Sequence, residues 1–418
     1  MGNDQTRTLQ TSNPNGLNVL FLSHIRVNSI YERGIFTDLA RFFMKQGHRV
    51  HFVAPVERMF KKPTHLIREE NSSILKVKTL NLLKMNFFEK GIGALLLGRQ
   101  YNIAIKKYFA GVRYDIILYS PPFVALQNVV REIKERDQAK TYLLLTDFFP
   151  QSAIDLGVFS EKNILCKYFR AQEKKLYQLA DHIGCMSPAG AKYVVERKNL
   201  DKTKVEVCPN SAEIDGKDPF TNKNREVLRR YNIPSHTINY ILGGNLGKPQ
   251  GLDFLIDIIQ SRKNDLSSYF IIVGNGTEYG WIKKWMDYKK PVNAMLMPGL
   301  RQKDYTELVR ACDVGLIFLD KRFTVPHFPS RLVSYLENGL PILAATDPST
   351  DLGEIAEKNH FGFSCVNGDL DRFFAHLDWF SKNRSQMAEM GKNGYNFLLK
   401  NYTVSQAYNI IMKHFMKP

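Results

Sequence analysis

A glycine-rich turn in the second half of the chain has the residue types needed to bind a phosphate group. Residues 238–244 (INYILGG) predict a strand, and residues 245–251 (NLGKPQG) lead into an amphipathic helix that begins near Leu252. Glycine lets the backbone approach an anion, and a helix start favours negative charge. The spacing matches neither the Walker loop nor the dinucleotide fingerprint, and such turns also serve plain packing. We expect a phosphate to be held by Gly244, Asn245, Gly247 and Lys248.

A second glycine loop follows the next strand of the same half. Residues 269–273 (YFIIV) predict a strand, and Gly274 and Gly276 come directly after it. Because the carboxyl ends of parallel strands lie on one edge of a sheet, both loops would emerge at the same edge. Two such loops favour a ligand site more than either loop does alone.

A cation at the start of a helix is the third feature. Residues 327–331 (HFPSR) precede a helix in which Leu332 and Tyr335 face inward, and Ser330 is well placed as the N-cap. Arg331 in the first turn opposes the helix dipole unless an anion lies nearby. A bound diphosphate would explain this arginine, and a solvent-exposed arginine with a small energetic cost is the alternative.

Two polar residues in the first half could face a sugar. His24 follows the first strand, LNVLFLS, and Asp147 follows the strand residues TYLLLT. Side chains of these types can hydrogen-bond to sugar hydroxyls or take up a proton. A core histidine and a turn-capping aspartate are the structural alternatives at these positions.

Short apolar strands alternate with helices in both halves, which predicts parallel sheets covered by helices. The pattern restarts near residue 238, after a polar linker rich in turn formers, PNSAEIDGKDPFTNKN. We therefore expect an α/β protein with two Rossmann-like, doubly wound domains that face a cleft. The predicted segments are a disordered N-terminus (1–16), a first domain (17–212), a second domain (213–400), and a C-terminal helix (401–418) that packs back on the first domain.

Positive charge is concentrated in the first half. The net charge is +13 over residues 1–210 and +4 over residues 211–418, and residues 58–113 alone carry +9. This indicates an anionic partner. No nucleic-acid-binding signature accompanies the charge, whereas residues 80–109 interleave apolar side chains with Lys and Arg, as suits contact with an anionic membrane surface. A helix that packs on its own domain with its lysines in water is the alternative.

The cysteines and the start of the chain indicate the compartment. The five cysteines have no CxxC spacing and read as reduced core residues. Residues 1–16 are polar and contain no apolar signal region. These features predict a cytoplasmic protein, with a peripheral position on the inner face of the membrane suggested by the charge.

Four segments taken together resemble glycosyltransferase family 4. They are GGNLGKPQGLDFLI, IVGNGTE, MPGLRQKDYTELVRACDVGLIFL and FPSRLVSYLENGLPILAATD, in the order of that family's donor half. Asp147 begins an Asp-aromatic-aromatic-Pro motif similar to that of enzymes that build bacterial surface polysaccharides, such as capsule or lipopolysaccharide. The resemblance implies the GT-B fold, with an acceptor-binding first domain and a second domain that binds a nucleotide sugar, by default a UDP-sugar. It also implies a lipid-linked or saccharide acceptor.

Several positions depart from the family pattern. The family's two glutamates, which contact the ribose and the sugar of the donor, fall on Ser334 and Pro326. Glu337 is near but lies on a different face of its helix. The family's Arg and Lys for the diphosphate fall on Asn245 and Gln250. The ribose-binding residue is therefore left open.

The residues and the resemblance together assign roles. We expect Lys248, Arg331 and the backbone amides of 245–247 and 330–332 to hold the diphosphate, and Gly299 and Leu300 to line the base pocket. His24, Asp147 and His327 would face the sugars. The predicted donor site is Gly244, Asn245, Gly247, Lys248, Gly274, Gly276, Gly299, Leu300, His327, Ser330, Arg331, Leu332 and Ser334, and the predicted catalytic residues are Asp147, His24 and Arg331.

The resemblance implies retention of the anomeric configuration, with the leaving phosphate taking the acceptor's proton. We expect no cofactor and no metal, because Asp369-Leu370-Asp371 fits a helix N-cap better than a metal-binding DxD motif. Three alternatives stay open. They are an inverting transferase with Asp147 or His24 as the base, a nucleotide-sugar epimerase, and a non-catalytic scaffold bound to the membrane.

Overall fold

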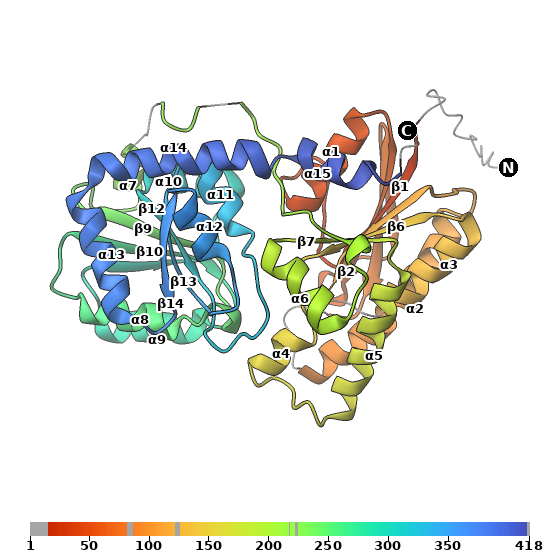
Figure 1. Ribbon diagram of the computed structural model, residues 1–418, viewed down its shortest axis with the longest axis horizontal. Helices are drawn as coiled ribbons and strands as arrows, with labels where there is room; N and C mark the ends of the chain where they lie inside the picture. The colour runs from red at the N-terminus through yellow and green to blue at the C-terminus, as the bar shows by residue number, and fades with distance from the viewer. Residues whose placement is uncertain (1–15, 82–86, 122–125, 217, 222–224, 416–418) are drawn as a thin grey trace.

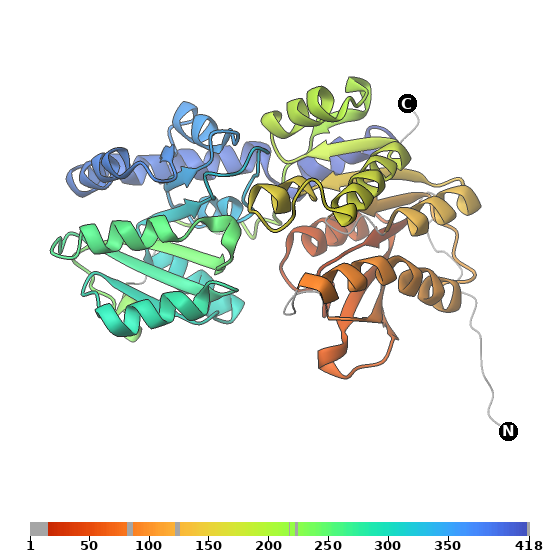
Figure 2. The ribbon, with the colours of Figure 1, turned by 90° about the horizontal axis from the view of Figure 1, so that it is seen from below.

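The computed structural model describes residues 16–81, 87–121, 126–216, 218–221 and 225–415, without the side chains of 87–95. Two β-sheets form from separate halves of the described chain (Figure 1). Figure 2 shows, from below, that helices cover both faces of the sheets. The predicted α/β fold with two Rossmann-like domains is confirmed. The predicted disordered N-terminus lies outside the described residues, apart from residue 16.

The first sheet has the strand order β3-β4-β2-β1-β5-β6-β7-β8, in which β3 is antiparallel to β4 and the other described pairs are parallel. Successive residues of β1 enter opposite cores: Val19 and Phe21 pack on one face, and Leu20 and Leu22 on the other. Burial on both faces explains why residues 19–22 of β1 are continuously apolar. The strands are β1 (Asn18–Leu22), β2 (Arg49–Glu57), β3 (His65–Glu69), β4 (Ser72–Thr79), β5 (Ile116–Tyr119), β6 (Lys140–Leu145), β7 (His182–Cys185) and β8 (Val205–Val207). The helices are α1 (Ile35–Lys45), η1 (Arg58–Phe60), α2 (Phe87–Tyr108), α3 (Gln127–Asp137), α4 (Gln151–Asp155), α5 (Ile164–Leu179), α6 (Pro188–Lys198) and η3 (Lys202–Lys204).

The second sheet is parallel throughout its described strands, with the order β11-β10-β9-β12-β13-β14. The strand order reverses between β9 and β12, which is where doubly wound folds bind ligands. The strands are β9 (Ile238–Asn245), β10 (Ser268–Asn275), β11 (Ala294–Met297), β12 (Val314–Phe318), β13 (Ile342–Thr346) and β14 (Gly362–Val366). The helices are α7 (Glu226–Arg230), η4 (Lys248–Gln250), α8 (Asp253–Ser261), α9 (Tyr279–Lys289), α10 (Gln302–Ala311), α11 (Arg331–Glu337), α12 (Leu352–Lys358), α13 (Leu370–Lys382), α14 (Arg384–Asn401) and α15 (Val404–Met412).

The chain crosses between the two sheets twice, and the two crossings touch. The Ala212 amide donates to the Tyr402 carbonyl at 3.0 Å, and the Val404 amide donates to the Ala212 carbonyl at 3.1 Å. Beyond this bridge, α15 packs on α1 of the first domain, where the Tyr408 hydroxyl lies 2.8 Å from His48 Nε2. Figure 1 shows α14 along the second domain and α15 on the first. The end of the chain therefore helps to hold the two domains together.

Two further findings bear on the sequence predictions. All five cysteines are buried and none is in a disulfide, as expected of reduced core residues. Among the described helices, none is long and apolar enough to cross a bilayer.

Candidate functional site

The strands β9 and β12 separate at the carboxyl end of the second sheet, and the region between their ends is called the crevice below. The two strands pair at Tyr240 with Val314 and at Ile241 with Gly315, and β9 continues to Asn245 without β12. The ring of Tyr335, from α11, lies directly against Gly315, where a Cβ atom would overlap the ring. The tyrosine therefore acts as a wedge at the point where the strand order reverses.

The Tyr335 hydroxyl takes over the hydrogen bonds that the neighbouring strand does not supply. It donates to the Ile241 carbonyl at 3.0 Å and accepts from the Gly243 amide at 3.1 Å. The Tyr305 side chain occupies the space that a Cβ atom at Gly243 would need. The end of β9 is thus fixed by the buried Tyr335 and the partly buried Tyr305. Gly244 follows with a φ of 106°, a conformation that favours glycine.

Arg331, at the start of α11, has one guanidinium nitrogen without a hydrogen-bond partner among the described residues. Its Nη2 atom donates to the Asn245 carbonyl at 3.3 Å and lies next to Gly244. Its Nη1 atom is buried without a hydrogen-bond partner among the described residues. A buried donor without a partner carries a desolvation cost of about 1–3 kcal/mol, and more for a charged group. An anion at the end of β9 would remove this cost.

The backbone amides around the crevice differ from the prediction. The Leu246 amide donates to the Asn275 carbonyl at 2.9 Å, and the Gly247 amide donates to Gln250 Oε1 at 2.8 Å. These two amides are therefore occupied, because η4 forms where the sequence suggested a direct entry into α8. The Leu332 amide is also occupied, by the Pro329 carbonyl at 3.2 Å.

The start of α11 retains free amide groups. Ser330 is at the N-cap position, but its hydroxyl makes no capping bond, so its predicted capping role is wrong. Within the described chain, the amides of Ser330 and Arg331 have no hydrogen-bond acceptor. These two amides and the Arg331 guanidinium remain available to one anion.

The second glycine loop supports the first by packing. A side chain at Gly274 would overlap the Gly244 carbonyl, and one at Gly276 would overlap the Leu246 carbonyl. The two loops are therefore stacked closely at one edge of the sheet, as expected. The Gly299 amide lies 3.4 Å from Asn275 Oδ1, which places the predicted base-pocket segment next to this loop.

The remaining predicted donor residues lie around the crevice without contacting each other. Lys248 is exposed, and Leu300 is half-buried beside the core of the second domain. Ser334 is half-buried one turn after Arg331 on α11. Ser334 stays a predicted donor-site residue, and the residue that binds the ribose stays open.

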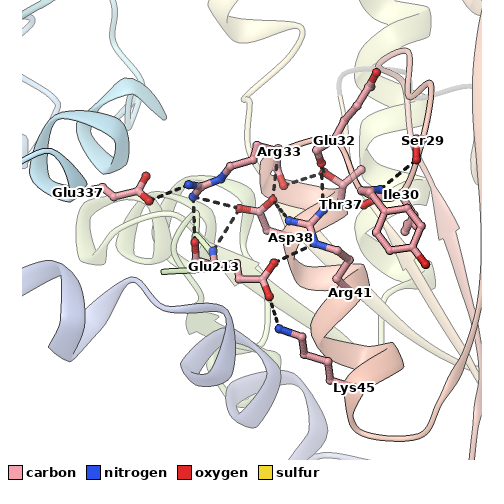
Figure 3. A network of polar contacts seen from close by, with 12 residues as sticks. Ser29, Ile30, Glu32, Arg33, Thr37, Asp38, Arg41, Lys45, Glu213 and Glu337 are labelled. Atoms are coloured by element: carbon pink, nitrogen blue, oxygen red, sulfur yellow. Dashed lines mark hydrogen bonds and ion pairs between the residues drawn. The ribbon is translucent and has the colours of Figure 1, made fainter. Parts of the chain in front are cut away.

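Glu337, the nearest carboxylate to the family's glutamate position, has another partner. It pairs with Arg33 of the first domain at 2.8 Å, and the Arg33 Nη2 atom also donates to the Glu213 carbonyl at 2.9 Å. Figure 3 shows Glu337 directed into this network, which includes Asp38 and Arg41. Burial raises the pKa of Glu337, and Arg33 counteracts the shift. This carboxylate therefore bridges the domains.

His327 and Asp147 approach each other from different domains. His327 Nε2 is buried without a partner among the described residues, and its ring packs 4.2 Å from Phe323 and 6.2 Å from Phe148, measured between ring centroids. Burial lowers the pKa of His327, while the charges of Asp147 and Asp155 oppose the shift. Asp147 also accepts from the Ser152 hydroxyl at 3.1 Å, so it has the turn-capping contact that was its alternative role.

His24 lies at a different point of the first domain's edge. Its Nδ1 atom is 3.2 Å from the Ser120 hydroxyl, and its ring contacts Phe36. Burial lowers its pKa to about 4, so the imidazole is neutral at neutral pH. A neutral imidazole can hydrogen-bond to a sugar hydroxyl, but it cannot balance a phosphate charge.

Two carboxylates that the sequence did not identify connect the domains, and each accepts a hydrogen bond from a backbone amide of the other domain. Asp155 of the first domain accepts from the Thr324 amide at 2.7 Å, and Asp351 of the second accepts from the Ala189 amide at 2.8 Å. Ala189 lies in the first turn of α6, where a carboxylate is favoured. These hydrogen bonds connect the two domains directly.

No group of three or more His, Cys, Asp or Glu residues among the described side chains could hold a metal ion. Asp369 Oδ1 accepts from the Arg372 amide at 3.0 Å, which confirms it as the N-cap of α13.

The Tyr335 wedge can be tested by removing one hydroxyl. Tyr335→Phe leaves the Gly243 amide and the Ile241 carbonyl without partners, so we expect a loss of about 1–3 kcal/mol in the free energy of unfolding of the second domain. Urea denaturation followed by tryptophan fluorescence reports on this domain, because all three tryptophans (Trp281, Trp285 and Trp379) lie in it.

Tyr240→Phe is the matched control, since Tyr240 is a buried tyrosine of β9 whose hydroxyl has no hydrogen bond of standard geometry to a described residue. We expect this variant to differ from the wild type by less than about 0.5 kcal/mol. Equal effects of the two substitutions would contradict the role assigned to Tyr335.

Comparisons with known proteins agree with this architecture. Residues 224–397 match the family described as Glycosyl transferases group 1. The probable glycosyltransferase WbjE of Pseudomonas aeruginosa is 24% identical over 232 residues, which span 55% of this chain and 57% of that relative. The chain therefore matches little more than half the length of this curated relative.

Solved structures share the fold at low sequence identity. Sucrose-phosphate synthase from Thermosynechococcus elongatus has a TM-score of 0.74 at 13% identity, over 95% of this chain and 98% of that one. Anabaena Alr3699/HepE in complex with UDP and glucose has a TM-score of 0.67 at 16% identity, over 95% and 99%. WaaG, a glycosyltransferase involved in lipopolysaccharide biosynthesis, has a TM-score of 0.65 at 10% identity, over 94% and 99%. Residues 224–397 thus match the glycosyl transferases group 1 family, within a chain whose fold is that of GT-B glycosyltransferases.

Proposed function

We propose that this protein is a glycosyltransferase that transfers a sugar from a nucleotide diphosphate donor. The observation that carries the proposal is the Nη1 atom of Arg331, which is buried without a partner among the described residues, while Nη2 of the same guanidinium lies beside Gly244 at the point where the strand order reverses. The family of residues 224–397 supports the reaction class. Two relatives are described by their ligand or role: HepE in complex with UDP, and WaaG in lipopolysaccharide biosynthesis. They support a UDP-sugar donor and a role in bacterial surface polysaccharide synthesis.

The donor's diphosphate would lie across the start of α11. Arg331 would supply charge and two guanidinium donors, and the free amides of Ser330 and Arg331 would complete the contact. Lys248 is exposed at the rim and can add a second cation. Negative charge accumulates on the leaving diphosphate as the glycosidic bond breaks, so donors fixed in advance stabilise the transition state. No metal or cofactor is part of this proposal.

The sugars would lie between the two domains. His327 and Asp147 come from different domains, and the Asp147 charge acts on His327, so we place them against hydroxyls of the transferred sugar or the acceptor. His24 would contribute a neutral hydrogen-bonding group from the first domain. A retaining reaction needs no strong protein base if the leaving phosphate accepts the proton of the acceptor hydroxyl.

The acceptor is proposed to be lipid-linked or a saccharide, with residues 58–113 in peripheral contact with an anionic membrane on its cytoplasmic face. The side chains of Met59 and Phe60 in η1 are 46% and 39% exposed, and they adjoin Arg58, Lys61 and Lys62. Apolar groups flanked by cations suit an anionic interface. Residues 82–86 and the side chains of 87–95, which belong to the same region, lie outside the described part of the chain.

Arg331 provides the direct test of the donor site. Arg331→Ala should lower kcat/KM for the donor by about 10²–10³-fold, because a charge-assisted contact to the leaving group is lost. Steady-state transfer from UDP-sugars measures the effect. Arg229→Ala is the control, since Arg229 is an exposed arginine that pairs with Glu226 on the surface of α7. Near-normal transfer by the Arg331 variant would contradict the assignment.

The stereochemistry of the product separates the retaining proposal from an inverting enzyme. With an α-configured donor, we expect the proton NMR coupling of the new anomeric centre to report an α linkage. A β linkage would overturn retention and favour Asp147 or His24 as a base. Conversion of the donor without any acceptor would indicate an epimerase, and the absence of both binding and turnover would indicate a scaffold.

A further inference from the structure

The loop that joins β12 to α11 belongs to the second domain by sequence but packs into the core of the first. It spans residues 319–330, contains His327 and ends directly before α11. Phe323 and Val325 of this loop are 2% and 0% exposed, and they belong to the same hydrophobic cluster as the strands β1, β5 and β6 of the first domain. The loop is therefore anchored in one domain while it leads to a site in the other.

Thr324, between these two buried residues, is exposed and bonds to the first domain through its polar groups. Its amide donates to Asp155 Oδ2 at 2.7 Å, and its hydroxyl donates to the same carboxylate, 3.0 Å from Oδ1 and 2.9 Å from Oδ2. Asp155 is the last residue of α4, which lies on the side of the first domain that faces the second (Figure 1). One carboxylate thus holds the loop through both a backbone amide and a hydroxyl.

Helix α4 also holds the aspartate that faces the sugars in the proposed site. The Ser152 hydroxyl donates to Asp147 Oδ1 at 3.1 Å, and Gln151 Nε2 donates to Asp155 Oδ1 at 2.7 Å. Arg170 of α5 donates in turn to Gln151 Oε1. The Asp155 carboxylate is therefore itself fixed in position, and α4 connects Asp147 to the anchored loop.

The turn after β13 holds the same loop from the second domain. The Thr350 hydroxyl donates to the His327 carbonyl, and the Ser349 hydroxyl donates to the Phe323 carbonyl at 3.3 Å. These bonds reach the loop backbone on both sides of Thr324. The buried Nε2 atom of His327 has no hydrogen-bond partner in the described chain. The position of this side chain therefore depends on how the loop backbone is held.

We propose that Asp155 is a positioning residue, which acts on sugar transfer through His327 by fixing the loop 319–330 between the domains. The inference rests on the proposed function, in which His327 contacts a sugar hydroxyl. A displacement of about 1 Å in such a group can lower a rate on the order of 100-fold. Arg331, by contrast, lies on α11, whose Tyr335 is buried in the core of the second domain. Loss of the Asp155 contact should therefore affect transfer more than donor binding.

Asp155→Ala removes both hydrogen bonds to Thr324. We expect kcat for sugar transfer to fall by about tenfold or more, while the Kd for UDP changes by less than about twofold. Because Phe323 and Val325 keep the loop packed, the melting temperature should shift by less than about 3 °C. Steady-state kinetics, calorimetry and thermal denaturation of the full chain measure the three quantities. Equal losses in kcat and in UDP binding, with a large drop in melting temperature, would overturn the proposal.

Asp201→Ala is the matched control. Asp201 accepts from the Thr203 amide at 2.9 Å and from the Thr203 hydroxyl at 2.8 Å, within one turn of the first domain. This substitution removes the same pair of hydrogen bonds at a distance from the loop, and it should leave kcat unchanged. Asp155→Asn keeps a carbonyl acceptor for the Thr324 amide, so we expect it to retain at least about a third of the wild-type kcat. A kcat as low as that of Asp155→Ala would overturn positioning by these hydrogen bonds.

A double-mutant cycle with His327→Ala tests whether Asp155 acts through this histidine. If it does, Asp155→Ala lowers kcat by less than about twofold once the imidazole is absent, because residues that act as a unit are not additive. The full tenfold loss in both backgrounds would show that Asp155 acts independently of His327 and would overturn the proposal.

Hydrogen exchange followed by mass spectrometry gives a readout that does not depend on activity. Peptides that cover residues 319–330 should exchange at least about tenfold faster in Asp155→Ala than in the wild type, because the loop opens more often. Unchanged exchange would overturn the anchoring by Asp155. The absence of transfer by the wild-type chain from every nucleotide sugar would refute the proposed function, and with it the role in transfer, while faster exchange would still show that Asp155 anchors the loop.

Discussion

The Tyr335 hydroxyl bonds to Ile241 and Gly243 at the point where the ladder between β9 and β12 stops. This contact lets the two strands separate while their polar backbone groups remain satisfied, which a buried strand end requires. The same helix places Arg331 one turn earlier, beside the end of β9. The shape of the crevice and the position of its cation therefore depend on one short helix and on the gap that Gly315 leaves for the tyrosine ring.

Helix α11 also connects the crevice to the first domain. Arg331 stands at its start, and Glu337 at its end pairs with Arg33 across the domain boundary. Arg33 belongs to the network of Asp38, Arg41 and Glu213 that anchors the linker to α1 (Figure 3). Removing Arg33 would leave the mostly buried Glu337 carboxylate without its partner, so this network restricts how the domains can sit. Three residues after Ser334, Glu337 thus supplies a carboxylate that couples the domains.

Sequence patterns were sufficient for the fold and for the edge of the sheet that carries the site. The alternation of apolar strands and helices predicted both sheets, and the glycine loops predicted their stacked strand ends. The patterns did not reveal β3 and β4, because their residues, such as Arg68, Lys76 and Lys78, make the segment 65–79 too polar to resemble the other strands. Strand β14 was also missed, since a glycine and a serine interrupt its apolar run.

Within the site, the sequence identified Arg331 from its conflict with the helix dipole. It could not show that the Leu246 and Gly247 amides are occupied, because their partners Asn275 and Gln250 are set by the turn that η4 makes. Tyr335 was read as an ordinary inward residue. Its hydrogen bonds depend on the separation of two strands that are distant in sequence, so no local pattern reports them.

The most direct test of the account is a crystal structure of the chain with UDP. We predict that the diphosphate of UDP lies at the ends of β9 and β12, within hydrogen-bond distance of Arg331 Nη1 and of the amides of Ser330 and Arg331. A structure in which UDP binds elsewhere, with Nη1 still unpartnered, would contradict this prediction.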